Sequence, residues 1–144
     1  MKVTADTNVL LRTIVGDDAA QSARAVDLLE QADMVAVSLQ TLCELVRVLR
    51  GRYGVQRADI AAAIRMLLNT GNVVVNRLAA EAGLAMLEVG GDFADGVIAY
   101  DGAWLGTETF VSFDKQGRVL AEEAGPVRAA ALIGTSPIPV IAKL

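Results

Sequence analysis

Short apolar runs alternate with longer amphipathic stretches along the chain, a pattern that predicts strands and helices in turn. Strands are predicted at residues 2–5, 34–37, 73–75 and 110–113, with a last one at 127–130. Helices are predicted at residues 18–31, 38–51, 57–69, 78–89, 92–105 and 115–124. This alternation favours an α/β sandwich with a mainly parallel central sheet and right-handed crossovers.

Helical periodicity is clearest after Ser38, which has the position and side chain of an N-cap. Asp18 with Gln21 similarly resembles a capping box. The apolar residues that recur at helical spacing after Ser38 are Leu42, Leu45, Val46, Leu49 and Tyr53. They predict a core-facing stripe, and Glu44 lies outside it.

The last segment differs from the rest of the chain. Residues 131–144 contain Gly134, Pro137 and Pro139 and show no clear periodicity. We therefore expect one domain over residues 1–130, followed by a C-terminal tail or extension over residues 131–144.

Composition excludes several chemistries. The 144 residues include no histidine, so Ser-His and Cys-His catalysis and imidazole zinc sites are excluded. Cys43 is the only cysteine, cannot form an internal disulfide, and lies in an apolar helical run, which favours a buried, inert thiol. Any catalysis must use carboxylates, hydroxyls, lysine, arginine or a hard metal ion.

The N-terminal residues lack the apolar core of a signal peptide, and no uncharged apolar run is long enough to span a bilayer. We therefore expect a cytoplasmic protein with no membrane contact. The net charge of −4 argues against nonspecific nucleic-acid binding. Four arginines nevertheless cluster within eleven positions, namely Arg47, Arg50, Arg52 and Arg57. Arg47, Arg50 and Arg52 are candidates for phosphate contacts, with a solvated helix face as the alternative.

Aromatic residues are few in this chain. Tyr53, Tyr100 and Trp104 fall at helical spacings, so we expect them in the core rather than stacked on bases.

Four acids stand out by their placement in the predicted elements. Asp6 follows the first strand, Glu44 lies within a helix, Asp95 lies at a helix start, and Asp114 follows a later strand. Each has an ordinary alternative. Asp6 can begin a turn, Glu44 can pair with Arg47, and the other two can favour helix N-termini.

As a set, these acids suggest a cation site. Like charges that lie close together are costly unless a cation neutralises them. Hard oxygen ligands without imidazole or thiolate select Mg²⁺ or Mn²⁺, and such ions assist phosphoryl chemistry. Spacing alone leaves this interpretation and the ordinary ones equally open.

The sequence resembles PIN-domain proteins, in particular the VapC-type ribonuclease toxins of bacterial toxin–antitoxin modules. The resemblance rests on four pieces in order: residues 6–11 (DTNVLL), Ser38 with Glu44-Leu45, residues 92–95 (DFAD) and Phe113-Asp114. It implies a three-layer α/β/α fold and an endoribonuclease that depends on Mg²⁺ or Mn²⁺. It also implies a homodimer, inhibition by a cognate antitoxin, and contact with operator DNA only through that antitoxin.

Residue by residue, the resemblance assigns metal binding to Asp6, Glu44, Asp95 and, more variably, Asp114. It makes Asn8, Ser38 and Ser112 polar candidates for orienting ligands or substrate. Asp92 has a family-like position, but we expect it to cap a helix. Substrate contacts are expected from Arg47 and Arg50.

The chain departs from the family at Gly96, where alanine is more usual, and in the tail after Ala130. A glycine there loosens the helix start by up to ~1 kcal/mol.

Three other functions remain open. The chain could be a PIN-fold nuclease outside a toxin–antitoxin pair, or a non-catalytic RNA-binding module. It could also be a metal-dependent phosphatase or haloacid-type hydrolase with Asp6 as nucleophile. Those hydrolases have a second acid two residues after the nucleophilic aspartate, and this chain has Asn8 at that position.

Overall fold

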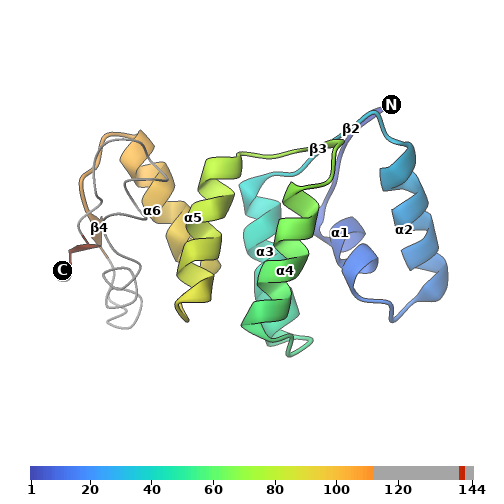
Figure 1. Ribbon diagram of the computed structural model, residues 1–144, viewed down its shortest axis with the longest axis horizontal. Coiled ribbons are helices and arrows are strands. Elements are labelled where there is room, and N and C mark those ends of the chain that lie inside the picture. The colour runs from blue at the N-terminus through green and yellow to red at the C-terminus, as the bar shows by residue number, and fades with distance from the viewer. Residues whose placement is uncertain (112–139, 142–144) are drawn as a thin grey trace. The chain divides into compact units, whose positions relative to one another are not determined.

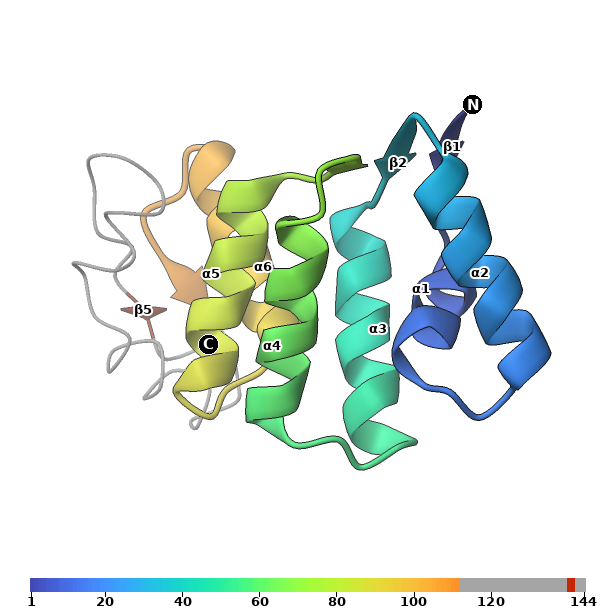
Figure 2. The same cartoon turned by 45° about the vertical axis from the view of Figure 1, so that its right-hand side comes forward.

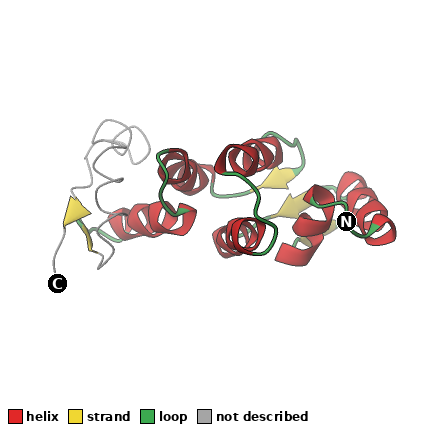
Figure 3. Cartoon of the chain, turned by 90° about the horizontal axis from the view of Figure 1, so that it is seen from below, coloured by secondary structure: helices red, strands yellow, loops and turns green. Residues whose placement is uncertain are grey.

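The structure is a computed structural model that describes residues 1–111 and 140–141. It divides into two compact units, Met1–Asn76 and Arg77–Leu144, and each unit is described by itself. Helices make up most of the described chain (Figure 3). No helix among the described residues has both the length and the apolar character needed to cross a membrane.

The first unit contains a three-stranded sheet whose strands are all parallel. The strands are β1 (Lys2–Thr4), β2 (Met34–Ala36) and β3 (Val73–Val74), in the spatial order β1-β2-β3. Thr4 pairs with Ala36, and Ala36 pairs with Val74. The prediction of a parallel α/β fold is therefore confirmed.

Four helices connect these strands: α1 (Thr7–Ile14), α2 (Ala19–Gln31), α3 (Leu39–Gly51) and α4 (Arg57–Leu68). Figure 2 shows them side by side in the order α2, α1, α3, α4, and in the view of Figure 1 α4 lies in front of α3. The predicted helices at residues 18–31, 38–51 and 57–69 are confirmed. Helix α1 was not predicted, and the alternative in which Asp6 begins a turn is wrong, because Asp6 is the N-cap of α1.

The core of the first unit is formed by the apolar faces of these helices. On α3, Leu42, Leu45 and Leu49 are completely buried, as the periodicity predicted. Ile60 and Ile64 of α4 are completely buried as well. Complete burial of one such side chain contributes about 1.5–3 kcal/mol, so these faces fix the positions of the helices and of the polar residues on them.

The second unit begins with α5 (Arg77–Glu88) and α6 (Phe93–Trp104), joined by a short turn in which Gly90 has a φ of 94°. Strand β4 (Phe110–Val111) pairs in parallel with β5 (Val140–Ile141). Strand β5 thus comes from the segment expected to form a tail, and the proposed boundary after residue 130 stays a prediction. The elements expected at residues 115–124 and 127–130 lie outside the described residues.

Two glycines let α5 and α6 approach closely. A Cβ on Gly96 would lie 2.4 Å from the carbonyl oxygen of Ala82, and one on Gly83 would lie 2.6 Å from the ring of Phe93. A backbone oxygen cannot move aside as a flexible side chain can. Gly96 therefore has a packing role that its helix propensity alone did not reveal.

The expectation that Trp104 lies in the core was wrong. Phe93, Val97 and Tyr100 on the same helical face are buried, but Trp104 is 71% exposed. Trp104 is the last residue of α6, so it lies one turn beyond the buried part of that face. Its Nε1 donates a hydrogen bond to the Tyr100 hydroxyl. Tyr100 is a core residue, as predicted.

Gly96→Ala is expected to destabilise the protein by about 1–3 kcal/mol, since the new methyl group meets the α5 backbone. Urea unfolding followed by circular dichroism measures this change. Gly51→Ala is the matched control, because a Cβ at Gly51 on α3 meets nothing within 4 Å. That control should be neutral or slightly stabilising. Equal stability of Gly96→Ala and the unmodified protein would contradict the packing role.

Candidate functional site at the carboxyl edge of the parallel sheet

The strand register brings three polar residues to one edge of the sheet. Thr4, Ala36 and Val74 form one row of paired residues across β1, β2 and β3. The strands end at these residues, and extending the same register by two positions aligns Asp6, Ser38 and Asn76 at this edge. Because the carboxyl ends of parallel strands border the crevice where α/β folds bind ligands, this edge is the candidate site.

Asp6 combines this position with a local structural role. Its backbone is extended, with φ −88° and ψ 173°, and its Oδ1 accepts a hydrogen bond of 2.9 Å from the Val9 amide. The side chain is exposed, and Oδ2 has no partner among the described residues. One oxygen thus fixes the carboxylate while the other remains available to a ligand.

Ser38 does for α3 what Asp6 does for α1. Its Oγ accepts a hydrogen bond of 3.1 Å from the Thr41 amide and lies 3.0 Å from Thr41 Oγ1. The predicted N-cap is confirmed. Two adjacent helix N-termini, each with a polar cap, therefore begin at this edge, and their dipoles favour negative ligands there.

Glu44 lies six residues after Ser38 on α3 and is half-buried. The Arg47 guanidinium binds both of its carboxylate oxygens, with Nη2 2.7 Å from each and Nε 3.2 Å from Oε2. These hydrogen bonds, and then the charge of Glu44, raise the pKa of Arg47 above its ordinary value. Glu44 therefore forms an ion pair with Arg47 in the described structure, as the alternative interpretation of this residue expected.

The other arginines of the cluster lie toward the end of α3 and beyond. Arg50 is exposed, and the Arg52 guanidinium lies 5.7 Å from the centre of the Tyr53 ring. Arg57 is the first residue of α4 and has a partner. Arg47 is occupied by Glu44, so Arg50 is the more accessible of the two arginines predicted to contact substrate.

In the second unit, Asp92 caps α6. Its Oδ1 accepts a hydrogen bond of 3.0 Å from the Ala94 amide, in agreement with the interpretation from sequence. Asp95 lies in the first turn of α6 and is half-buried, with an interaction partner of its own. Ser112 and Asp114 lie outside the described residues.

Within residues 1–111 and 140–141, no three or more His, Cys, Asp or Glu side chains form a group that could hold a metal ion. The predicted set takes Asp6 and Glu44 from the first unit, Asp95 from the second, and Asp114 from outside the described residues. The four-acid metal site stays a prediction. Its donors are all hard oxygens, which suit Mg²⁺ and Mn²⁺.

Asn76 was not among the residues proposed from sequence. It follows the apolar run Val73-Val74-Val75 directly, and extending the register of β2 and β3 by two positions aligns it with Ser38 at the candidate site. The signal that singled out Asp6, a polar residue directly after a predicted strand, was present for Asn76 as well. Strand pairing shows that both belong to one edge.

The capping role of Asp6 gives a stability prediction. Asp6→Ala removes the hydrogen bond to the Val9 amide and should destabilise the protein by about 1 kcal/mol. Asp6→Asn should change stability by only a few tenths of a kcal/mol, because asparagine caps helices as well as aspartate. Urea unfolding distinguishes these outcomes. Equal destabilisation by both substitutions would show that Asp6 stabilises the fold by some means other than capping.

Comparison with known proteins agrees with this fold. The family model described as PIN domain matches residues 3–123, which is most of the chain. Searches of curated proteins and of solved structures found no match. PIN domains are generally nucleases, which implies hydrolysis of a nucleic-acid substrate. On the extent of this match, the chain belongs to the PIN domain family.

Proposed function

We propose that this protein is a metal-dependent endoribonuclease and the toxin of a VapBC-type toxin–antitoxin pair. The observation that carries the nuclease proposal is the row formed by Asp6, Ser38 and Asn76 at the carboxyl edge of the sheet. Glu44 adds a second carboxylate on the helix that starts from this edge. Family membership supports phosphodiester hydrolysis at such a site.

In this proposal, Asp6, Glu44 and Asp95 hold one or two Mg²⁺ or Mn²⁺ ions, with help from Asp114. When bound, these ions lower the pKa of water and stabilise the charge that develops on the leaving oxygen. The Val9 amide keeps the Asp6 carboxylate oriented through its hydrogen bond. If Glu44 held an ion, it would give up its contacts with Arg47, and the guanidinium would become available to the RNA backbone.

The reaction proposed is an in-line attack of water on phosphorus, which breaks the bond to the 3′-oxygen. The products are a 3′-hydroxyl and a 5′-phosphate. Asn8 and Ser38 are positioned near Asp6 to orient the substrate or the ligands, and Ser112 is a further candidate from the sequence. Single-stranded loops of tRNA or rRNA are the favoured substrates, since sequence-specific RNA recognition usually targets unpaired loops.

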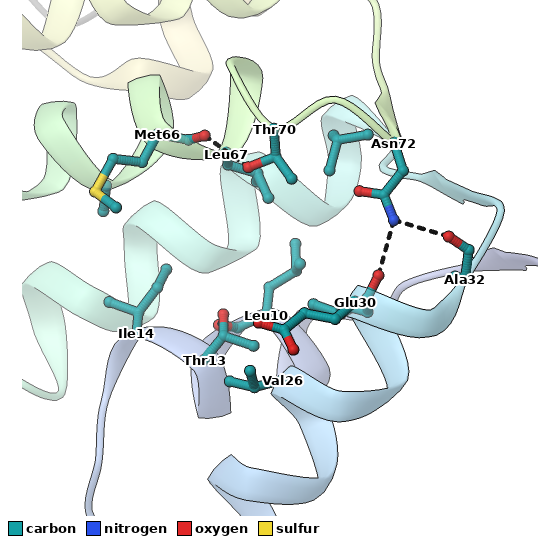
Figure 4. Close-up of a pocket in the computed structure, with 13 residues that line it drawn as sticks. Leu10, Thr13, Ile14, Val26, Glu30, Ala32, Met66, Leu67, Thr70 and Asn72 are labelled. Carbon is teal, nitrogen blue, oxygen red and sulfur yellow. Dashed lines mark hydrogen bonds between the residues drawn. The ribbon is translucent and has the colours of Figure 1, made fainter.

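An apolar groove in the first unit supports the toxin–antitoxin part of the proposal. It has a volume of about 710 Å³ and lies between α1, α2 and α4 (Figure 4). Leu10, Ile14, Val26, Met66 and Leu67 are among the apolar residues that line it. An amphipathic helix of an antitoxin could lay its apolar face into a groove of this kind.

Hydrogen bonds fix one part of the groove lining. The Asn72 amide donates hydrogen bonds to the Leu29 and Ala32 carbonyl oxygens, at 2.8 and 2.9 Å, and so ties the loop before β3 to the end of α2 (Figure 4). Met66 on the rim is 74% exposed. Ile14 and Val26 line the same groove and are exposed as well, and contiguous exposed apolar surface often marks a site that a partner covers.

A homodimer is also part of the proposal. Trp104 and Leu105, at the end of α6, are 71% and 87% exposed and are candidates for the contact between subunits. Operator DNA would be contacted only through the antitoxin, and the toxin itself would act in the cytoplasm.

The phosphatase or haloacid-type alternative is weaker. Those enzymes need a second acid two residues after the nucleophile, and here Asn8 occupies that place, inside the first turn of α1.

The nuclease proposal predicts that Asp6→Asn reduces RNA cleavage in Mg²⁺ or Mn²⁺ at least a hundredfold while the fold is retained. Asp18→Asn is the matched control, because Asp18 caps α2 through a 3.0 Å hydrogen bond in the same way. The control should cleave at the unmodified rate, and EDTA should stop both proteins. A gel assay with labelled RNA measures the rates. Cleavage that survives Asp6→Asn or EDTA would contradict the mechanism.

The groove predicts a variant that separates toxicity from neutralisation. Met66→Glu places a charge on the apolar rim, so growth arrest should persist when the proposed cognate antitoxin is co-expressed. The unmodified protein should be neutralised in the same strain. Leu78→Glu, an exposed apolar position on α5 outside the groove, is the control and should still be neutralised. Neutralisation of Met66→Glu would show that the groove is not the antitoxin site.

A further inference from the structure

A second hollow lies between α1 and α2, separate from the apolar groove. It has a volume of about 460 Å³. Its polar lining comes from Asn8 and Arg12 on α1 and from Gln21 and Arg24 on α2. The apolar part of its lining includes Leu28, which is 39% exposed. A small hollow with amide and guanidinium donors and some apolar surface suits a polar anion that carries an organic group.

The hollow starts two residues along the chain from the candidate-site residue Asp6. Asn8 lies in the first turn of α1, two residues after Asp6, and Arg12 follows one turn later on the same face. From Asn8 to Arg12, the hollow therefore extends about 6 Å along α1. Gln21 and Arg24 stand three residues apart on the facing side of α2.

The two arginines differ in how they are held. Arg12 Nη1 lies 2.7 Å from Asp17 Oδ1, and the Tyr53 hydroxyl donates a 3.3 Å hydrogen bond to the other oxygen of Asp17. Arg12 is thus fixed in place by a partner that partly offsets its charge. Arg24 makes no ion pair or hydrogen bond in the described part of the chain, so its donors are available.

We propose that the hollow between α1 and α2 binds a phosphodiester of the RNA substrate, next to the one that is cut; this rests on the proposed nuclease function. Arg24 donates to the phosphate oxygens through its planar fork of N–H groups, and Arg12 adds positive charge. The Asn8 and Gln21 amides lie within the same hollow and supply hydrogen bonds to phosphate or sugar oxygens. Leu28 offers apolar surface to the ribose.

The subsite gives an acidic protein a way to bind RNA. The net charge of −4 opposes general attraction to a polyanion, so contacts have to come from local arginines. A subsite near Asp6 would hold the RNA strand in a fixed place relative to the carboxylates. This would position the phosphodiester that is to be cut.

The test is RNA binding by fluorescence anisotropy, with a fluorescein-labelled single-stranded RNA of mixed sequence in EDTA. Arg24→Gln should weaken binding about threefold to tenfold and lower the slope of log Kd against log salt by about 0.7. Arg65→Gln removes the same charge from an exposed position on α4 outside the hollow and should leave both values unchanged. Arg24→Lys, which keeps the charge but not the fork, should recover part of the affinity.

An unchanged affinity and salt slope for Arg24→Gln, or equal effects of Arg24→Gln and Arg65→Gln, would overturn the subsite. So would the absence of measurable RNA binding by the unmodified protein. The nuclease proposal is judged separately, by cleavage of the same RNA in Mn²⁺. Cleavage by the unmodified protein together with unchanged binding by Arg24→Gln would reject the subsite and retain the nuclease.

Discussion

Parallel pairing of β1, β2 and β3 is the constraint on which the candidate site depends. The register aligns Thr4, Ala36 and Val74, and so places Asp6, Ser38 and Asn76 in one row at the carboxyl edge. A shift of one residue in either pairing would turn the side chains of a strand to the opposite face of the sheet. The buried faces of α3 and α4 hold this register by packing the connecting helices in one arrangement.

The N-caps at this edge serve structure and chemistry together. A capping side chain accepts a hydrogen bond from a backbone amide through one oxygen. This fixes the direction of the side chain and leaves further acceptor sites on it. Asp6 therefore has a defined orientation while it remains exposed. Glu44 has no cap to hold it, and the two-oxygen contact with Arg47 orients it instead. Asp6 is thus held with one oxygen unpaired among the described residues, whereas both oxygens of Glu44 are engaged by Arg47.

Elements whose formation depends on local sequence were predictable. The helices that became α2, α3, α4, α5 and α6 were expected within a few residues, and so were the caps at Asp18, Ser38 and Asp92. Helix α1 was missed because it is only eight residues long and follows polar residues that also suit a turn. Asp6 is an N-cap of the same kind as Ser38, which was recognised from its position and polar side chain.

Features that arise from packing could not be predicted. The contact of Gly96 with the α5 backbone appears only when both helices are placed. The exposure of Trp104 depends on where the buried face of α6 ends. The hollow between α1 and α2 needed both helices in position, and Arg24 had no sequence signal at all. Convergence of the four acids is a long-range property of this kind and rests on the family resemblance.

The central claim is that acids from far apart in the chain bind one cation site. A double-mutant cycle on Mn²⁺ binding, measured by isothermal titration calorimetry with Asp6→Asn, Asp95→Asn and the double variant, tests it most directly. We expect each single substitution to weaken Mn²⁺ binding, with a coupling free energy of about 0.5–3 kcal/mol between them. Strictly additive effects, or unchanged Mn²⁺ affinity in either single variant, would contradict the shared site.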